Sequence, residues 1–199
     1  MISFQKRFLF VHIPKTGGNS IQSVLARYSD DEITRRPGQD GIERFGVSNP
    51  KYKLKKHSAL AEYRAALGDK KFAQLYKFAA VRNPWDRLVS LYFTPIRQKQ
   101  WDRKAFKKTI TQALSAADHL RLDEHDADPF ANVNRIIQFE QLAEDFSAVC
   151  ADLGIPAEPL PRYNKSERQH YSQYYDDELR ALVAERFALE IARLGYTFD

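Results

Sequence analysis

The feature that most constrains the fold is a pair of short apolar runs, each of which ends at a proline-containing loop. Residues 5–13 and 76–81 are rich in apolar, β-prone side chains. Such continuous runs are typical of strands buried on both faces, as in parallel sheets. Each is followed by helically spaced apolar residues, over 19–28 and from 84 to about 98. The pattern predicts an α/β fold, with a central parallel sheet flanked by helices.

The rest of the chain continues this alternation. A third strand is expected over residues 133–139. Further helices are expected over residues 57–67, 102–120, 140–153 and 176–194. Long connections with little regular structure are expected over residues 30–56, 118–128 and 155–175. The length of 199 residues suits a single domain that spans 1–199.

Composition excludes several classes of protein. Hydrophobic residues make up 43% and charged residues 29%, a balance that excludes disordered and low-complexity chains. The one cysteine, Cys150, can form neither an internal disulfide nor a thiol zinc site, which favours a reducing, cytoplasmic location. No apolar stretch approaches the roughly 20 residues of a membrane span. The N-terminal apolar run is also too short for a signal peptide.

Charge is divided unevenly along the chain. Residues 1–108 carry 23 Lys and Arg against 9 Asp and Glu, whereas residues 109–199 carry 8 against 17. The basic half is expected to face an anion, with a solvated basic surface as the alternative. No zinc-finger spacing or RNA-binding signature is present, so a small polyanion is expected rather than nucleic acid. The sequence specifies no oligomeric state.

The loop after the first strand, PKTGG, has the parts of an anion cradle. Gly17 and Gly18 allow backbone N–H groups to converge, and the following helix, which Asn19 or Ser20 could cap, presents its positive end. Lys15 adds a mobile charge. A Walker A sequence would place the lysine after the glycines, so this loop is of another kind. A simple tight turn is the alternative.

The loop after the second strand also suits an anion. Arg82 stands at the strand end, and Ser90 lies about two helical turns further on. An arginine fork and a hydroxyl could share one phosphate, and ligands of parallel sheets bind beyond the carboxyl ends of the strands. The alternatives are a surface ion pair between Arg82 and Asp86, and a serine that faces solvent.

These motifs resemble a known family. FVHIPKTGGNSI is similar to the 5′-phosphosulfate loop, and KFAAVRNPWDRLVSLY to the 3′-phosphate motif, of sulfotransferases that use 3′-phosphoadenosine 5′-phosphosulfate (PAPS). The branch is that of carbohydrate 2-O- and chondroitin-type enzymes. Weaker likenesses at 54–63, 139–146 and 161–178 extend over most of the chain. The resemblance implies a fold related to P-loop nucleotide kinases, and sulfuryl transfer from PAPS to a hydroxyl of a carbohydrate or glycoconjugate.

The resemblance also implies roles for individual residues. Lys15 would stabilise the leaving 5′-phosphate of the product, 3′-phosphoadenosine 5′-phosphate (PAP). The 5′-phosphate would be held by Thr16, Gly17, Gly18, Asn19 and Ser20, with Lys15. The 3′-phosphate would be held by Arg82 and Ser90. The late loop would close over the nucleotide with Lys165, Ser166 and Arg168, unless these form a solvated charge cluster.

A histidine is the expected general base, because its ordinary pKa is near 6.5. His57 lies between the two motifs, and HSALAEY resembles the segment that bears the base in 2-O-type enzymes. Lys55 and Lys56 would lower its pKa and favour the neutral form. A free surface histidine is the alternative. His12 is expected to be a hydrogen-bonded core residue.

No metal is expected. The remaining histidines show no ligand spacing, and no triphosphate is cleaved; they are His119, His125 and His170. Four tyrosines could stack on adenine or a sugar, or could simply pack: Tyr163, Tyr171, Tyr174 and Tyr175. Two other functions stay open, an ATP-dependent small-molecule or nucleotide kinase and a non-catalytic nucleotide- or polyanion-binding module.

Overall fold

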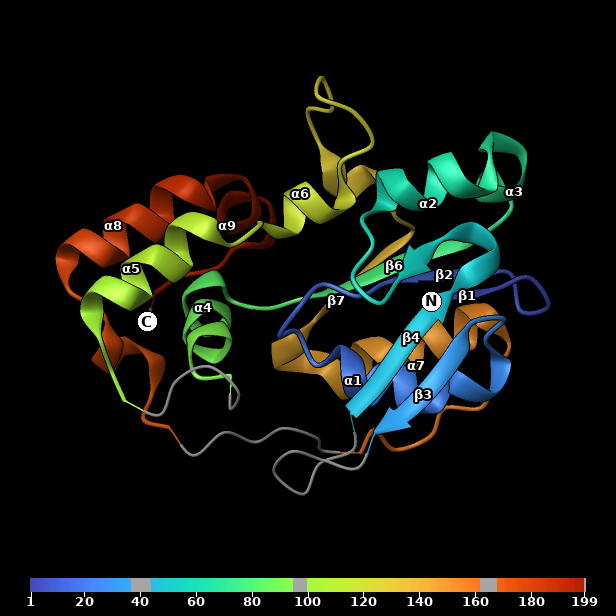
Figure 1. Ribbon diagram of the computed structural model, residues 1–199, viewed down its shortest axis with the longest axis horizontal. Helices are drawn as coiled ribbons and strands as arrows, with labels where there is room; N and C mark the ends of the chain where they lie inside the picture. Colours follow the sequence, from blue (N-terminus) through green and yellow to red (C-terminus); the bar gives the residue numbers. More distant parts are fainter. Residues whose placement is uncertain (37–43, 95–99, 162–167, 199) are drawn as a thin grey trace.

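The structure is a computed structural model that describes residues 1–36, 44–94, 100–161 and 168–198. Its centre is a sheet with the order β1-β2-β6-β7 (Figure 1). The strands are β1 (Ile2–Ser3), β2 (Phe8–Val11), β6 (Tyr76–Val81) and β7 (Arg135–Gln138). β2, β6 and β7 are parallel, and β1 pairs antiparallel with β2. The predicted α/β class, with a central parallel sheet between helices, is confirmed.

Alternation along β2 divides the core between the two faces of this sheet. Leu9 and Val11 point to one face, where they pack against α2 (Leu60–Leu67) and α6 (Ala116–Leu120). Phe8 and Phe10 point to the other, where they pack against α1 (Gly18–Leu25) and α7 (Leu142–Leu153). Because all four β2 side chains are buried, the strand is a continuous apolar run.

A third layer of helices lies beside the edge of the sheet from which β6 leads into α4 (Figure 1). Its members are α4 (Pro84–Tyr92), α5 (Arg103–Gln112), α8 (Asp177–Arg186) and α9 (Ala188–Leu194). α4 begins with Pro84 at its first position, and Asn83 caps it by accepting a hydrogen bond from Trp85 N. The described late-loop tyrosines belong to this aromatic layer, so they pack rather than present open faces: Tyr171, Tyr174 and Tyr175. Tyr163 lies outside the described residues.

The expectation of little regular structure over 30–56 is wrong. An antiparallel sheet of order β3-β4-β5 forms there, from β3 (Glu32–Arg36), β4 (Arg44–Asn49) and β5 (Leu54–Lys55). Ile33 pairs with Val47, and both pack against the core cluster that contains Phe10. Most residues of these two strands are polar or charged, so the sequence does not show the alternation that predicts a strand. Residues 37–43 lie outside the described part of the chain.

Two predicted helices are each split in two. The helix expected over 102–120 breaks into α5 and α6, because Ser115 caps the new helix in a capping box with Asp118. The helix expected over 176–194 breaks into α8 and α9 at Phe187, whose buried side chain sits between them at φ −113° and ψ 21°.

Other boundaries differ by a few residues. α4 ends at Tyr92 rather than near residue 98, and α2 begins at Leu60 rather than at His57. α3 (Asp69–Ala73) follows α2. The short 3₁₀ turns are Ala26–Tyr28, Pro50–Tyr52, Pro129–Asn132, Phe139–Gln141 and Tyr171–Tyr174. Among the described helices, none combines the length and the apolar character needed to cross a bilayer.

Candidate functional site

The loop after β2 has an unusual backbone. Lys15 has a φ of 72° and Gly17 a φ of 81°, so two residues in one short turn are left-handed. This conformation is unfavourable for lysine and persists where the surroundings hold it. The buried Thr16 hydroxyl helps by donating to the carbonyl of Ile13 at 2.8 Å. The loop is therefore a built conformation, not a generic tight turn.

The first turn of α1 is open to an anion. Gly17 is its N-cap residue and has no side chain to cap it, so neither Asn19 nor Ser20 takes the expected N-cap position; of the first N–H groups, that of Ser20 donates to the Gly17 carbonyl at 3.0 Å. Ser20 is buried, and the Asn19 side chain instead accepts a hydrogen bond from Lys56 Nζ at 2.7 Å. Uncapped N–H groups and the helix dipole together favour a negatively charged ligand.

Both glycines of the loop are required by close packing. A Cβ on Gly18 would lie 2.3 Å from His12 Cδ2, and one on Gly17 would lie 2.9 Å from Leu142 Cδ2. His12 is buried, as expected, and burial holds its pKa well below 6.5; a contact with the Gln22 side chain opposes this. Among the described residues, however, His12 Nδ1 has no partner in hydrogen-bonding geometry, so the expected hydrogen bonding of the ring is not found at this nitrogen.

His57 is held against the same loop. Its Nδ1 lies 2.9 Å from the carbonyl oxygen of His12, and the two rings are 4.7 Å apart. A carbonyl can only accept, so Nδ1 carries the proton and Nε2 keeps its lone pair. His57 is exposed, but the atoms packed around it disfavour the charged form; this desolvation lowers its pKa below 6.5, and Lys56 lowers it further. The ring is thus neutral at pH 7, as a base requires.

Arg82 follows β6 and is fixed on three sides. Its Nε donates to Asp86 Oδ2 at 2.8 Å, its NH1 donates to the carbonyl of Lys15 at 3.3 Å, and its guanidinium lies 4.0 Å from the centre of the Phe139 ring. The side chain is 13% exposed. The alternative pairing with Asp86 is therefore present, but it is mostly buried rather than on the surface. The Lys15 contact brings the two predicted loops together.

Arg168 reaches the same carboxylate from the late loop. Its NH2 donates to Asp86 Oδ1, so Asp86 accepts from two arginines that are far apart in sequence. Lys165 and Ser166 lie outside the described residues. Ser90 is buried on α4 rather than solvent-facing, and among the described contacts no hydrogen bond joins it to Arg82.

Two further residues lie at the site that the sequence did not single out for a functional role, Phe139 and Asp86. A third residue, His119, is buried on α6, where His57 contributes to lowering its pKa. Phe139, just beyond β7, touches both loops, because it stacks on Arg82 and would also meet a Cβ on Gly17 at 3.0 Å. The sequence suggested Asp86 only as an alternative partner of Arg82. The spacing of four residues between Arg82 and Asp86 was the feature that indicated this pair. His119 on α6 is buried, and among the described residues its Nδ1 has no hydrogen-bond partner.

Burial lowers the pKa of His119 to about 4, with Arg87 and then His57 adding to the effect. In the part of the chain that the structure describes, no three His, Cys, Asp or Glu side chains are grouped so that they could hold a metal ion.

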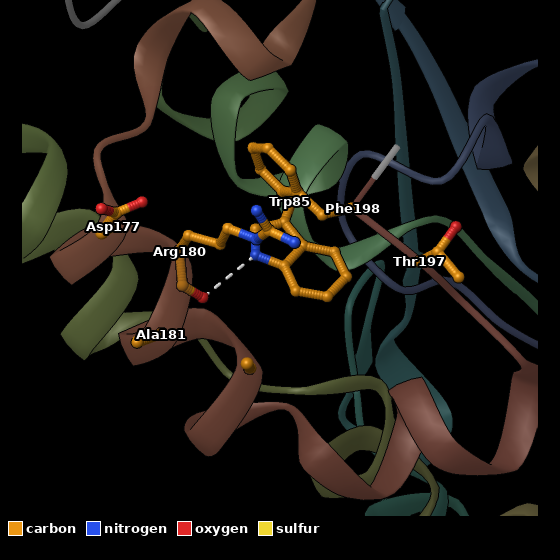
Figure 2. A pocket seen from close by; sticks show the side chains of 7 residues that line it. Trp85, Asp177, Arg180, Ala181, Thr197 and Phe198 are labelled. Atoms are coloured by element: carbon orange, nitrogen blue, oxygen red, sulfur yellow. Dashed lines mark hydrogen bonds between the residues drawn. The ribbon is translucent and has the colours of Figure 1, made fainter.

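A groove of about 570 Å³ lies elsewhere, between α8 and the C-terminal segment (Figure 2). Trp85 Nε1 donates to the carbonyl of Arg180 at 3.3 Å, and the Arg180 guanidinium lies 4.6 Å from the Phe198 ring centre. The groove is lined by Trp85, Asp177, Arg180, Ala181, Ala184, Thr197 and Phe198. It includes none of the predicted site residues. The strained loop, the uncapped helix and the buried arginines make the edge of the sheet the better candidate for an anion site.

Comparison with known proteins bears on the whole chain. The profile described as "Sulfotransferase family" matches residues 1–197. No curated protein and no solved structure matched the chain. The match covers both strand-end loops and the late loop that carries Arg168, and the sheet and helices suit the fold of that family. The chain therefore belongs to the sulfotransferase family, whose members are enzymes of sulfuryl transfer.

Proposed function

We propose that the protein transfers the sulfuryl group of PAPS to a hydroxyl of a carbohydrate or glycoconjugate. The observation that carries the proposal is the contact between the two strand-end loops, in which Arg82 donates to the carbonyl of Lys15. One ligand with two separate phosphates could touch both loops at once. PAPS is such a ligand, and it is the donor that this family usually uses.

The donor would be held at its two phosphate groups. The 5′-phosphate would accept from the open first turn of α1 and its loop, formed by Thr16, Gly17, Gly18, Asn19 and Ser20. The 3′-phosphate would lie against Arg82 and Arg168, which already share one carboxylate. Ser90, Lys165 and Ser166 remain proposed members of this second group.

Sulfuryl transfer resembles phosphoryl transfer, so positioning and charge stabilisation supply most of the catalysis. The bond between sulfur and the bridging oxygen breaks, and charge develops on that oxygen as PAP leaves. Lys15, on its left-handed backbone beside the uncapped helix, would stabilise this charge. A new bond forms between sulfur and the acceptor oxygen.

His57 would take the proton of the acceptor hydroxyl on Nε2. The His12 carbonyl fixes Nδ1 as the protonated nitrogen, and the lowered pKa keeps the ring neutral before reaction. The bond from Lys56 to Asn19 ties the segment that carries the base to the loop that would carry the donor. These contacts support a base held at a fixed place relative to the sulfur.

An anionic carbohydrate suits the charge of this part of the chain. The basic half, residues 1–108, includes every element from β1 to α4 and therefore both proposed donor loops. The free, buried Cys150 fits the reducing compartment that the sequence predicts, which stays a prediction.

Calorimetry with PAP and with ATP plus Mg²⁺ tests the donor. Binding of PAP and transfer of labelled sulfate from PAPS to a panel of glycans are expected. Tight binding of ATP without binding of PAP would instead indicate a kinase. A non-catalytic module would bind PAP equally well before and after His57→Ala and would transfer sulfate to no acceptor.

A further inference from the structure

Asp86 occupies an unusual position between two arginines. Its Oδ2 accepts from Nε and NH2 of Arg82, and its Oδ1 accepts from NH2 of Arg168. Side-chain exposure is 19% for Asp86, 13% for Arg82 and 11% for Arg168. Charge-assisted bonds in such a sheltered place are stronger than surface ion pairs. The three side chains therefore form one fixed unit, which we call the Asp86 cluster.

The Asp86 cluster joins three parts of the fold. Asp86 is on the first turn of α4, Arg82 follows β6, and Arg168 belongs to the late loop that precedes α8. Arg82 is also bonded to the carbonyl of Lys15 and stacked on Phe139. Asp86 is thus one point at which the described part of the late loop is held to the edge of the sheet.

The charges of the cluster do not cancel. Two guanidinium groups face one carboxylate, so these three side chains keep a net positive charge, mostly shielded from water; Glu140 also acts on Arg82, but less strongly than Asp86 does. Within the described contacts, Arg82 uses three of its five N–H donors. A further acceptor can therefore bind without displacing Asp86, provided that its charge outweighs the repulsion from the carboxylate. A phosphate dianion meets this condition, whereas a neutral hydroxyl gains little from guanidinium groups that a carboxylate already engages.

We propose that Asp86 is a positioning residue that makes the nucleotide site selective for a 3′-phosphate, by holding Arg82 and Arg168 together before the nucleotide arrives. The inference rests on the proposed function and deepens it. Pre-alignment lowers the cost of ordering two long side chains when the phosphate binds. A neutral 3′-hydroxyl gains little from guanidinium groups that the carboxylate already engages, so nucleotides without that phosphate are at a disadvantage.

The test compares PAP with adenosine 5′-phosphate, which lacks the 3′-phosphate, by calorimetry on the full chain. In Asp86→Asn the affinity for PAP should fall about tenfold or more, while that for adenosine 5′-phosphate changes less than about twofold. Asp86→Glu, which keeps the charge, should recover part of the loss. The matched control is Asp69→Asn, which breaks an exposed pair with Arg64 and should change neither affinity.

If the thermal transition of Asp86→Asn shows that this variant does not fold, a variant at Arg168 tests the same inference. Arg168→Gln should lower the preference for PAP by itself. Where Asp86→Asn does fold, the double variant should lose little more than either single one. Unchanged or tighter PAP binding in Asp86→Asn would overturn the inference, as would an equal loss for both nucleotides or an unchanged preference in Arg168→Gln. Failure of the unaltered protein to bind PAP would overturn the proposed function as well.

Discussion

The loops after β2 and β6 lie at the same edge of one sheet, but they are held by different forces. The first depends on backbone shape and contact: Lys15 and Gly17 are left-handed, and Gly18 has the His12 ring where a side chain would be. The second depends on charge, because Arg82 is fixed by Asp86 and by the Lys15 carbonyl. Changes in the first loop should therefore damage fold and catalysis together, whereas changes in the second should alter affinity and respond to salt.

The largest effect is expected from Gly18→Ala. The new Cβ would lie 2.3 Å from His12 Cδ2, and movement of this buried ring is restricted by its contacts with the Phe10 and His57 rings. Destabilisation of about 2 kcal/mol and loss of sulfate transfer should follow. Thermal unfolding and a transfer assay measure both.

Gly46→Ala is the control for this substitution, since its Cβ would meet Thr34 Cβ at an ordinary 3.5 Å. Similar, small effects of both substitutions would show that shape does not control the first loop.

Lys15→Ala should come next. The rate of transfer at saturating PAPS should fall about 100- to 1,000-fold, because charge on the leaving oxygen loses its partner, while PAP affinity falls far less. The control is Lys53→Ala, which removes another lysine with a positive φ, 55°, from the turn before β5. Equal losses in rate and in PAP affinity would assign Lys15 to binding rather than to the transition state.

His57→Gln should reduce the transfer rate about 100-fold with unchanged PAP affinity. In the unaltered enzyme the rate should be level above pH 6.5 and fall in acid, because desolvation by the atoms packed around His57 lowers its pKa below that value. The residual activity of the variant should lack this acid limb. His125→Gln, at an exposed histidine, is the control. A variant with the same pH profile as the unaltered enzyme would exclude His57 as the base.

Arg82→Gln should act mainly on binding. The affinity for PAP should fall about 10- to 100-fold through loss of charge-assisted bonds, and the dependence of affinity on salt should weaken. At saturating PAPS the rate should change little. Arg64→Gln, at an exposed arginine that also pairs with an aspartate, is the matched control. A loss of rate larger than the loss of affinity would mean that the second loop, like the first, is tied to the chemistry.

Local sequence patterns predicted the parts of the site that are local. Strands β2 and β6 are recognisable in the sequence as buried apolar runs. The two glycines follow the first run a few residues later, and Arg82 follows the second run directly. The position of Phe139 was not predictable in this way, because it depends on β7 pairing in register with β6, Val81 against Gln138.

Long-range pairing explains the other omissions. Arg168 meets Asp86 across 82 residues of chain, and no periodicity encodes such a contact. The antiparallel sheet of β3, β4 and β5 was missed because its residues are mostly polar and its register is set by partner strands. By contrast, the break before α6 was readable, because Ser115 and Asp118 have the spacing of a capping box.

Lowering the pH gives the smallest expected effect. It acts on the fold through buried histidines, whose charged form is disfavoured in the folded state. Histidines on the side of the first loop are kept neutral by burial, and His119 has its pKa lowered to about 4. Above pH 6.5 His119 is neutral in both the folded and unfolded states. As the pH falls from 6.5 toward 4, the unfolded chain takes up a proton that the folded one refuses, so stability decreases.

Between pH 7 and 5.5 this contribution should be about 1 kcal/mol, measured as the free energy of unfolding in urea. His119→Gln should remove that part of the pH dependence, whereas His125→Gln should leave it in place. If His119→Gln leaves the pH dependence of stability unchanged, then burial of this histidine does not control how the fold responds to acid, and the distinction between a region held by packing and a region held by charge fails.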